Sequence, residues 1–222
     1  MAGREGLARL ALAAAIIAGV SYLAADWVSA GPATHTAWKG AGVGLLAIYA
    51  ALRARRFDGW LITAVMALGA LGDVLLETSG MVIGALSFLA GHLVAIWLYL
   101  RNRRVVLSAS QALFAMVLFP AVVVTAYLLP ADRSTALVVT FYAVGLGLMA
   151  ASAWLSRFPR YWTGLGAVAF AVSDLLIFAQ AGPLENAAWT GFAVWALYFG
   201  GQAMIVIGVT RRLSNEAMAA LS

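Results

Sequence analysis

The sequence predicts an all-α, polytopic membrane protein with eight transmembrane helices. Hydrophobic residues make up 64% of its 222 residues and charged residues only 10%, whereas soluble domains carry about 25% charged residues. The mean hydropathy is +0.94. Apolar runs of about 20 residues, the length that crosses a bilayer, follow one another along the chain. This composition excludes a soluble enzyme, and the short breaks between runs predict a single integral membrane domain over residues 1–222.

Prolines separate the expected spans. Pro32, Pro130, Pro159 and Pro183 lie in the breaks between apolar runs, and Pro120 lies within the fifth run. Proline is tolerated inside a membrane helix because neighbouring groups satisfy the carbonyl that it frees. The expected spans cover residues 7–25, 36–52, 58–77, 80–100, 106–129, 134–154, 160–181 and 187–209.

Basic residues predict the orientation of these spans. Twelve of the 14 Lys and Arg residues lie on one side, and Lys39 and Arg133 lie on the other. The positive-inside rule makes the richer side cytoplasmic, so we expect both termini in the cytoplasm and the chain in a bacterial inner membrane. The net charge of +5 is thus interpreted as a topology signal, and no nucleic-acid partner is expected. The twelve residues are Arg4, Arg9, Arg53, Arg55, Arg56, Arg101, Arg103, Arg104, Arg157, Arg160, Arg211 and Arg212.

Several kinds of site are excluded by composition and motif. The absence of cysteine excludes disulfides, thiolate metal sites and cysteine nucleophiles. The sequence has two histidines without a His-Glu zinc signature, and it has no phosphate-binding loop or dinucleotide fingerprint. Retinal binding would need a lysine deep in a late span, but the single lysine is Lys39. No metal and no cofactor are therefore expected.

Three ionisable residues fall inside the expected spans: Asp73, His92 and Asp174. An ionisable group at a helix centre costs at least about 2.5–3.5 kcal/mol on insertion scales, so each is a functional candidate. At 1.5 Å per residue, both aspartates lie roughly 20 Å from the basic side, and His92 lies roughly 14 Å from it. Tyr142 reaches about the depth of the aspartates.

The two aspartates lie in similar segments. Residues 72–76 (GDVLL) and 173–177 (SDLLI) are 101 positions and four expected spans apart, and residues 91–92 (GH) correspond to 201–202 (GQ) in the spans that follow. This pattern predicts a parallel four-plus-four duplication whose halves meet in a shared interior. Chance similarity between apolar helices is the alternative.

Two carboxyl groups in one enclosed site would share a proton, so that one is protonated and the other ionised near neutral pH. Such a pair can donate a proton and activate water, as acid-catalysed hydrolysis requires. The same pair also fits a small proton-coupled transporter or lipid carrier. In a third interpretation, the aspartates only join helices of a non-catalytic scaffold. The residues alone leave these three alternatives open.

At these residues the sequence resembles the YhhN-like family of eight-span membrane proteins, which includes the lysoplasmalogenases. The resemblance covers nearly the whole chain and depends on the order and spacing of residues. They are Lys39, residues 71–76 (LGDVLL), Gly84, Phe88 and His92 at four-residue steps, Tyr142, residues 172–174 (VSD), Tyr198 and Gln202.

The resemblance implies hydrolysis of the vinyl ether bond of a lysoplasmalogen, giving a fatty aldehyde and glycerophosphocholine or glycerophosphoethanolamine. It implies that Asp73 and Asp174 are catalytic and that the substrate is a lysophospholipid taken from membrane lipid. We expect His92 and Tyr142 to orient the aspartates and Lys39, near the outer rim, to meet the lipid phosphate. Supporting roles are also expected for two residues of the last span, Tyr198 and Gln202.

Overall fold

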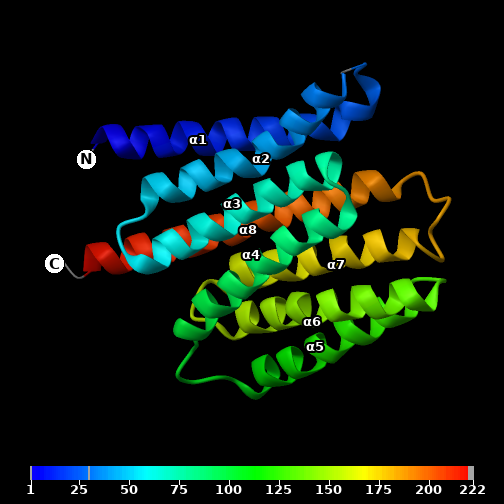
Figure 1. The fold of residues 1–222 in the computed structure, drawn as a ribbon. Helices are drawn as coiled ribbons and strands as arrows, with labels where there is room; N and C mark the ends of the chain where they lie inside the picture. The colour runs from blue at the N-terminus through cyan, green and yellow to red at the C-terminus, as the bar shows by residue number, and fades with distance from the viewer. Residues whose placement is uncertain (1, 30, 220–222) are drawn as a thin grey trace. The chain divides into compact units, whose positions relative to one another are not determined.

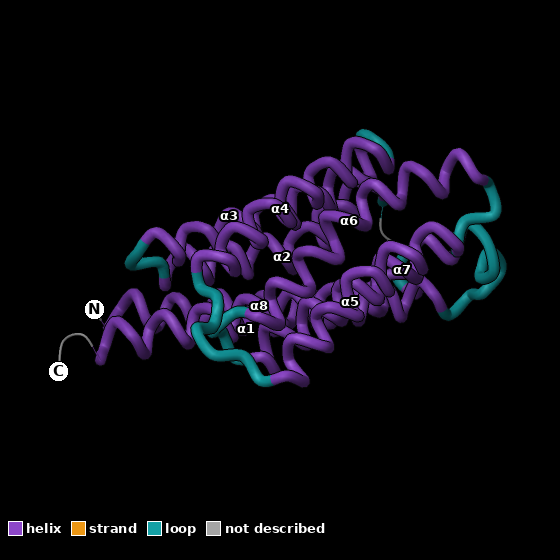
Figure 2. Tube along the Cα trace, turned by 90° about the horizontal axis from the view of Figure 1, so that it is seen from below, coloured by secondary structure: helices purple, strands orange, loops and turns teal. Residues whose placement is uncertain are grey.

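The computed structural model describes residues 2–29 and 31–219, which form eight α-helices and two short helical turns and contain no strand (Figures 1 and 2). The fold class is all-α, as predicted. The elements are α1 (Ala2–Ser21), η1 (Tyr22–Trp27), α2 (Pro32–Arg53), α3 (Phe57–Thr78), α4 (Met81–Arg101), α5 (Ala109–Leu128), α6 (Arg133–Leu155), η2 (Arg160–Gly164), α7 (Leu165–Gln180) and α8 (Thr190–Ala219).

Within the described residues, seven segments are long and apolar enough to cross a membrane. The chain is thus an integral membrane protein. The α2 helix is not among the seven, because His35, Lys39 and Arg53 lower its hydropathy. Its length of 22 residues would cross a bilayer, so the eighth span stays a prediction.

The chain divides into two compact units. The first comprises Met1–Leu98 and Val206–Ser222, and the second comprises Tyr99–Ile205. The helices α4 and α8 therefore contribute residues to both units. The predicted single domain and the predicted duplication are not tested by this division, and both stay predictions.

In the first unit, α2 runs alongside both α1 and α3 (Figure 1). A glycine permits the approach of α2 to α3, because a Cβ at Gly40 would lie 2.8 Å from Cγ2 of Val74. Small residues at such crossings let membrane helices pack closely. This packing fixes the register between the residues of α2 and those at the end of α3.

The helices α3 and α4 form a tight hairpin in the same unit. The chain turns at Gly80, whose φ of 88° is easily adopted by glycine. A Cβ at Gly84 would lie 2.6 Å from the Leu76 side chain, and a Cβ at Gly72 would lie 2.7 Å from the Phe88 ring. The hairpin thus aligns the end of α3 with the first half of α4.

In the second unit, α5 packs on α6, and α7 contacts α6. A capping box starts α5. The backbone amide of Gln111 donates to the Ser108 hydroxyl at 3.3 Å, and the backbone amide of Ser108 donates to the side-chain oxygen of Gln111 at 3.2 Å. This cap explains why the helix begins at Ala109 rather than at the predicted residue 106.

The seventh predicted span begins with a π-helical turn, η2, which leads directly into α7. The α8 helix extends beyond the predicted span, which ends at residue 209, and continues to Ala219. An ion pair of 2.7 Å between Arg212 and Glu216 joins successive turns of this extension.

Asp132 caps the N-terminus of α6. Its carboxylate accepts hydrogen bonds from the Ser134 hydroxyl and, at 2.7 Å, from the Thr135 amide. The Ser134 hydroxyl, together with the Thr135 amide, holds the pKa of Asp132 well below its usual range. A carboxyl with a depressed folded-state pKa contributes stability above its unfolded-state pKa of about 3.9, and this contribution is lost as pH falls through the folded-state value.

We therefore expect Asp132→Ala to lower the melting temperature at pH 7 and expect its difference from the native chain to shrink below about pH 4. Asp132→Asn keeps a side-chain acceptor for the helix end, so its melting temperature at pH 7 should lie between those of Asp132→Ala and the native chain. Thermal unfolding in detergent, followed by circular dichroism at pH 7 and pH 3, measures both differences. A difference between Asp132→Ala and the native chain that stays the same at both pH values would contradict the proposed link to the carboxylate charge.

Candidate active site

Asp73 is buried in α3, with 2% of its surface exposed, and His92 is buried in α4, with 4% exposed. Both belong to the α3–α4 hairpin of the first unit. Because Gly72 lies opposite Phe88, the level of Asp73 is about five residues, or about 7 Å along the helix axis, from that of His92. The hairpin therefore holds a buried carboxyl and a buried imidazole little more than one helical turn apart along its length.

An ion pair lies one turn from Asp73 on the same face of α3. Lys39 of α2 donates from Nζ to Oε1 of Glu77 at 2.6 Å, and the two side chains are 18% and 35% exposed. Glu77 follows Asp73 by four residues, so the two carboxyls share a helix face. Lys39 thus meets a carboxylate near the helix end.

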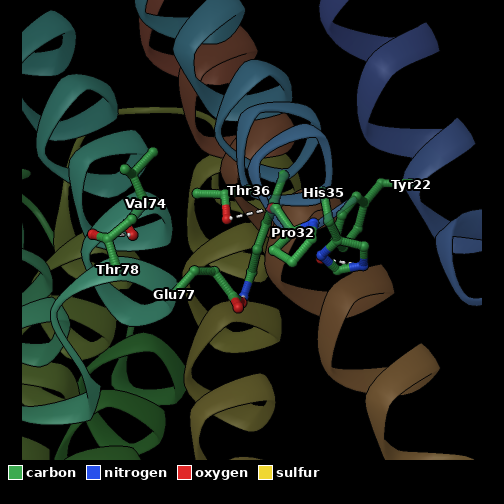
Figure 3. A network of polar contacts seen from close by, with 8 residues as sticks. Tyr22, Pro32, His35, Thr36, Val74, Glu77 and Thr78 are labelled. Carbon is green, nitrogen blue, oxygen red and sulfur yellow. Dashed lines mark hydrogen bonds and ion pairs between the residues drawn. The ribbon is translucent and has the colours of Figure 1, made fainter. Parts of the chain in front are cut away.

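Glu77 is not among the candidates predicted from the sequence, although the structure pairs it with Lys39. The spacing of four residues from Asp73 was the available signal. Nearby on α2, His35 contacts the Tyr22 hydroxyl at 3.2 Å, and Thr36 donates to the carbonyl of Pro32 at 3.0 Å (Figure 3). The start of α2 is therefore a polar region, in contrast to the apolar body of the helix.

In the second unit, the structure brings Tyr142 and Asp174 together. Asp174 lies on α7 with 7% of its surface exposed, and the Tyr142 hydroxyl of α6 donates to its Oδ2 at 2.7 Å. The Tyr142 ring also packs edge-on against Phe178, one turn along α7, with ring centroids 6.0 Å apart. Hydrogen bond and ring contact together restrict the orientation of the carboxyl.

The two candidates on α8 are both buried but lie at different levels. The Tyr198 ring packs against Phe170, one turn before Asp174, with centroids 5.3 Å apart. Ser173 donates to the carbonyl of Val194 at 2.9 Å, which sets the register between α7 and α8. In this register Gln202 lies about nine residues, or about 13 Å along the axis, from the level of Asp174. Tyr198 is thus much nearer to Asp174 than Gln202 is.

Asp73, His92 and Lys39 belong to the first unit, and Asp174, Tyr142, Tyr198 and Gln202 belong to the second. The convergence of the two aspartates in one site stays a prediction. Within residues 2–29 and 31–219, no group of three or more His, Asp or Glu side chains could hold a metal ion.

The fold and these residues define an all-helical integral membrane protein that carries carboxyl groups buried within its spans. The chain belongs to the YhhN family, whose model matches residues 34–209.

Two similar proteins are both named lysoplasmalogenase, one from Mycobacterium bovis (strain ATCC BAA-935 / AF2122/97) and one from Mycobacterium tuberculosis (strain CDC 1551 / Oshkosh). Each is 34% identical over an alignment of 159 residues, and the match covers 67% of this chain. The chain spans 59% of the length of these relatives. No solved structure matches the chain significantly.

Proposed function

We propose that this protein is a lysoplasmalogenase that hydrolyses the vinyl ether bond of a lysophospholipid by aspartate acid/base catalysis. The observation that carries this proposal is the burial of Asp73 and Asp174 within apolar spans, where an ionisable group persists only with a function or a partner. Similarity to relatives named lysoplasmalogenase supports the choice of reaction. No cofactor is required.

The proposed reaction needs one acid and one base. A protonated carboxyl donates its proton to the β-carbon of the vinyl ether, which leaves an oxocarbenium ion at the carbon bonded to oxygen. The second carboxyl, ionised, stabilises this cation and takes a proton from the water that attacks it. The resulting hemiacetal collapses to a fatty aldehyde and the glycerophospho-alcohol. Glycosidases use a pair of carboxyl groups on the same kind of cation.

The remaining candidates hold the substrate and the aspartates. Tyr142 fixes the orientation of Asp174 through its 2.7 Å hydrogen bond, and Tyr198 packs one turn away. His92 orients Asp73 from the neighbouring helix, Gln202 has a more distant supporting role, and Lys39 binds the lipid phosphate. We propose that α2 is the eighth span, that both termini are cytoplasmic and that the protein lies in a bacterial inner membrane.

An aldehyde-release assay tests this function. Protein purified in detergent should release fatty aldehyde from lysoplasmalogen but not from the saturated ether analogue, because only the vinyl ether forms the cation by protonation. A proton-coupled transporter would be silent in detergent and would require sealed vesicles with a gradient. Release from neither substrate, together with proton-dependent uptake into vesicles, would refute the hydrolase.

Lys39 and Glu77 provide a test with effects of opposite sign. In the proposed role, Glu77 occupies Lys39 until a lipid phosphate replaces it. Lys39→Gln should therefore raise KM by about tenfold, as expected for the loss of one charge-assisted hydrogen bond. Glu77→Gln should lower KM, because Lys39 is then unpaired. Steady-state kinetics on lysoplasmalogen measures both constants.

A purely structural ion pair would behave differently. The two substitutions would then change KM in the same direction or leave it unchanged. Partly exposed ion pairs contribute only about 0–1 kcal/mol to stability, so neither variant should fail to fold, and thermal unfolding verifies this.

A further inference from the structure

The first unit contains a cavity that the proposed reaction does not use. It is a small, partly open cavity that lies between the end of α2, the start of α3 and the last turns of α8. Its walls are lined by Ala50, Arg53, Arg55, Arg56, Gly59, Thr210, Leu213, Ser214 and Ala217. Asp73 and Glu77 lie at the opposite end of α3, so this cavity is distinct from the candidate active site.

Positive charge dominates the cavity. Arg53, Arg55 and Arg56 all line it, and Arg4 of α1 donates to the carbonyl of Ala54 at 3.2 Å and so lies beside it. One of these charges is balanced, since the Arg53 guanidinium donates to Glu5 at 2.7 Å. Arg55 and Arg56 are exposed, and no hydrogen bond of either side chain is recorded among the described residues. The cavity thus favours an anion.

One hydrogen-bond donor of a residue that lines the cavity also lacks a partner in the part of the chain that the structure describes. The Nε of Arg53 is buried and has no hydrogen-bond partner among the described residues, although the same guanidinium donates to Ser214 at 3.0 Å. Ser214 of α8 adds a hydroxyl group to the wall, whereas the Thr210 hydroxyl, one turn before it, donates to the carbonyl of Val206 at 2.7 Å. The first turn of α3 reaches the cavity at Gly59, and the N-terminus of a helix is the end that favours negative charge.

From these features we propose that the cavity binds the phosphate group of an anionic phospholipid in the cytoplasmic leaflet. Arginine guanidinium groups and hydroxyls are the donors that phosphate oxygens prefer. Basic pockets between membrane helices on the cytoplasmic side suit such head groups. The lipid would bridge the ends of α2, α3 and α8 and stabilise the first unit. A free phosphate ion has the same chemistry, and the experiment separates the two sources.

The test measures ligand-dependent stability of the full chain purified in detergent. Added phosphatidylglycerol should raise the melting temperature in a saturable way, and phosphatidylcholine should not. In Arg55→Gln/Arg56→Gln the apparent Kd for phosphatidylglycerol should rise by about tenfold or more, since charge-assisted hydrogen bonds are lost. The matched control is Arg9→Gln/Arg103→Gln, which removes the same charge and should leave Kd within about twofold, because both arginines are exposed and neither lines the cavity.

A parallel titration uses inorganic phosphate. A saturable shift with phosphate alone that depends on Arg55 and Arg56 would support the phosphate site and reassign its source from lipid to solution. The proposal would be overturned if neither ligand raised the melting temperature in a way that depends on Arg55 and Arg56. It would also be overturned if the control variant lost as much affinity as the Arg55→Gln/Arg56→Gln variant. The single variants Arg55→Gln and Arg56→Gln serve if the double variant does not fold.

Discussion

Asp73→Asn and Asp174→Asn are each expected to lower kcat for vinyl ether hydrolysis by about 10²- to 10⁴-fold, which is the typical contribution of a general acid or base. Asparagine has nearly the shape of aspartate, but it neither donates a proton to carbon nor accepts one from water. Turnover is measured as aldehyde released by protein in detergent. The yield of folded protein should stay near that of the native chain, because a buried amide replaces a buried carboxyl.

Tyr142→Phe provides a graded control. It removes the hydroxyl that donates to Asp174 at 2.7 Å but leaves both carboxyls in place. A hydrogen bond contributes about 0.5–1.5 kcal/mol to a neutral group and about 1.5–3 kcal/mol to a charged one, so kcat should fall by up to about 100-fold with little change in KM. If both Asp→Asn variants instead lose their folded yield, the aspartates serve to join helices, and the hydrolase mechanism would be rejected.

Gly201→Val is expected to cause a large loss of stability outside the candidate site. A Cβ at Gly201 would lie 2.6 Å from the carbonyl oxygen of Gly166 and 3.1 Å from the amide nitrogen of Phe170. These are backbone atoms of α7, which cannot rotate away, so the two helices must separate. Overpacking costs about 1–3 kcal/mol, which for a chain of this size lowers the melting temperature by about 2–12 °C.

The neighbouring glycine is the matched control. A Cβ at Gly200 would have nothing within 4 Å, so Gly200→Val should leave the melting temperature nearly unchanged. Both variants carry the same side chain in the same helix, and their difference therefore reports the contact with α7. Equal melting temperatures for the two variants, measured by thermal unfolding in detergent, would contradict the close packing of α7 on α8.

Hydropathy predicts the fold of this chain well because the length of an apolar run is fixed by the bilayer. It predicts helix ends less well. The start of α5 depends on the capping box of Ser108 and Gln111, and the end of α8 extends past the apolar run on polar residues. That α2 spans the membrane also stays a prediction, since the polar first half of α2 lowers the mean hydropathy of the helix.

For the candidate site, counting residues along a helix predicts the depth of a side chain in the membrane but not the direction in which it points. The count placed Tyr142 near the depth of Asp174, and the structure adds the hydrogen bond between them. The count could not show that Glu77 pairs with Lys39, because the pairing depends on how closely Gly40 lets α2 approach α3. The register of two packed helices depends on such contacts, and counting residues along one helix gives no information about them.

The four-residue spacing from Asp73 to Glu77 sets a fixed distance along α3. Four residues of an α-helix rise about 6 Å, and the Lys39–Glu77 pair lies at the Glu77 end of this distance. Under the proposed function, a phosphate held at that end would leave the three-carbon glycerol unit to span the turn and would present the alkenyl oxygen near the inner carboxyl. Selectivity would then follow from the length of the glycerol backbone, and lipids with a longer spacer between phosphate and alkenyl chain would place the wrong atoms at Asp73.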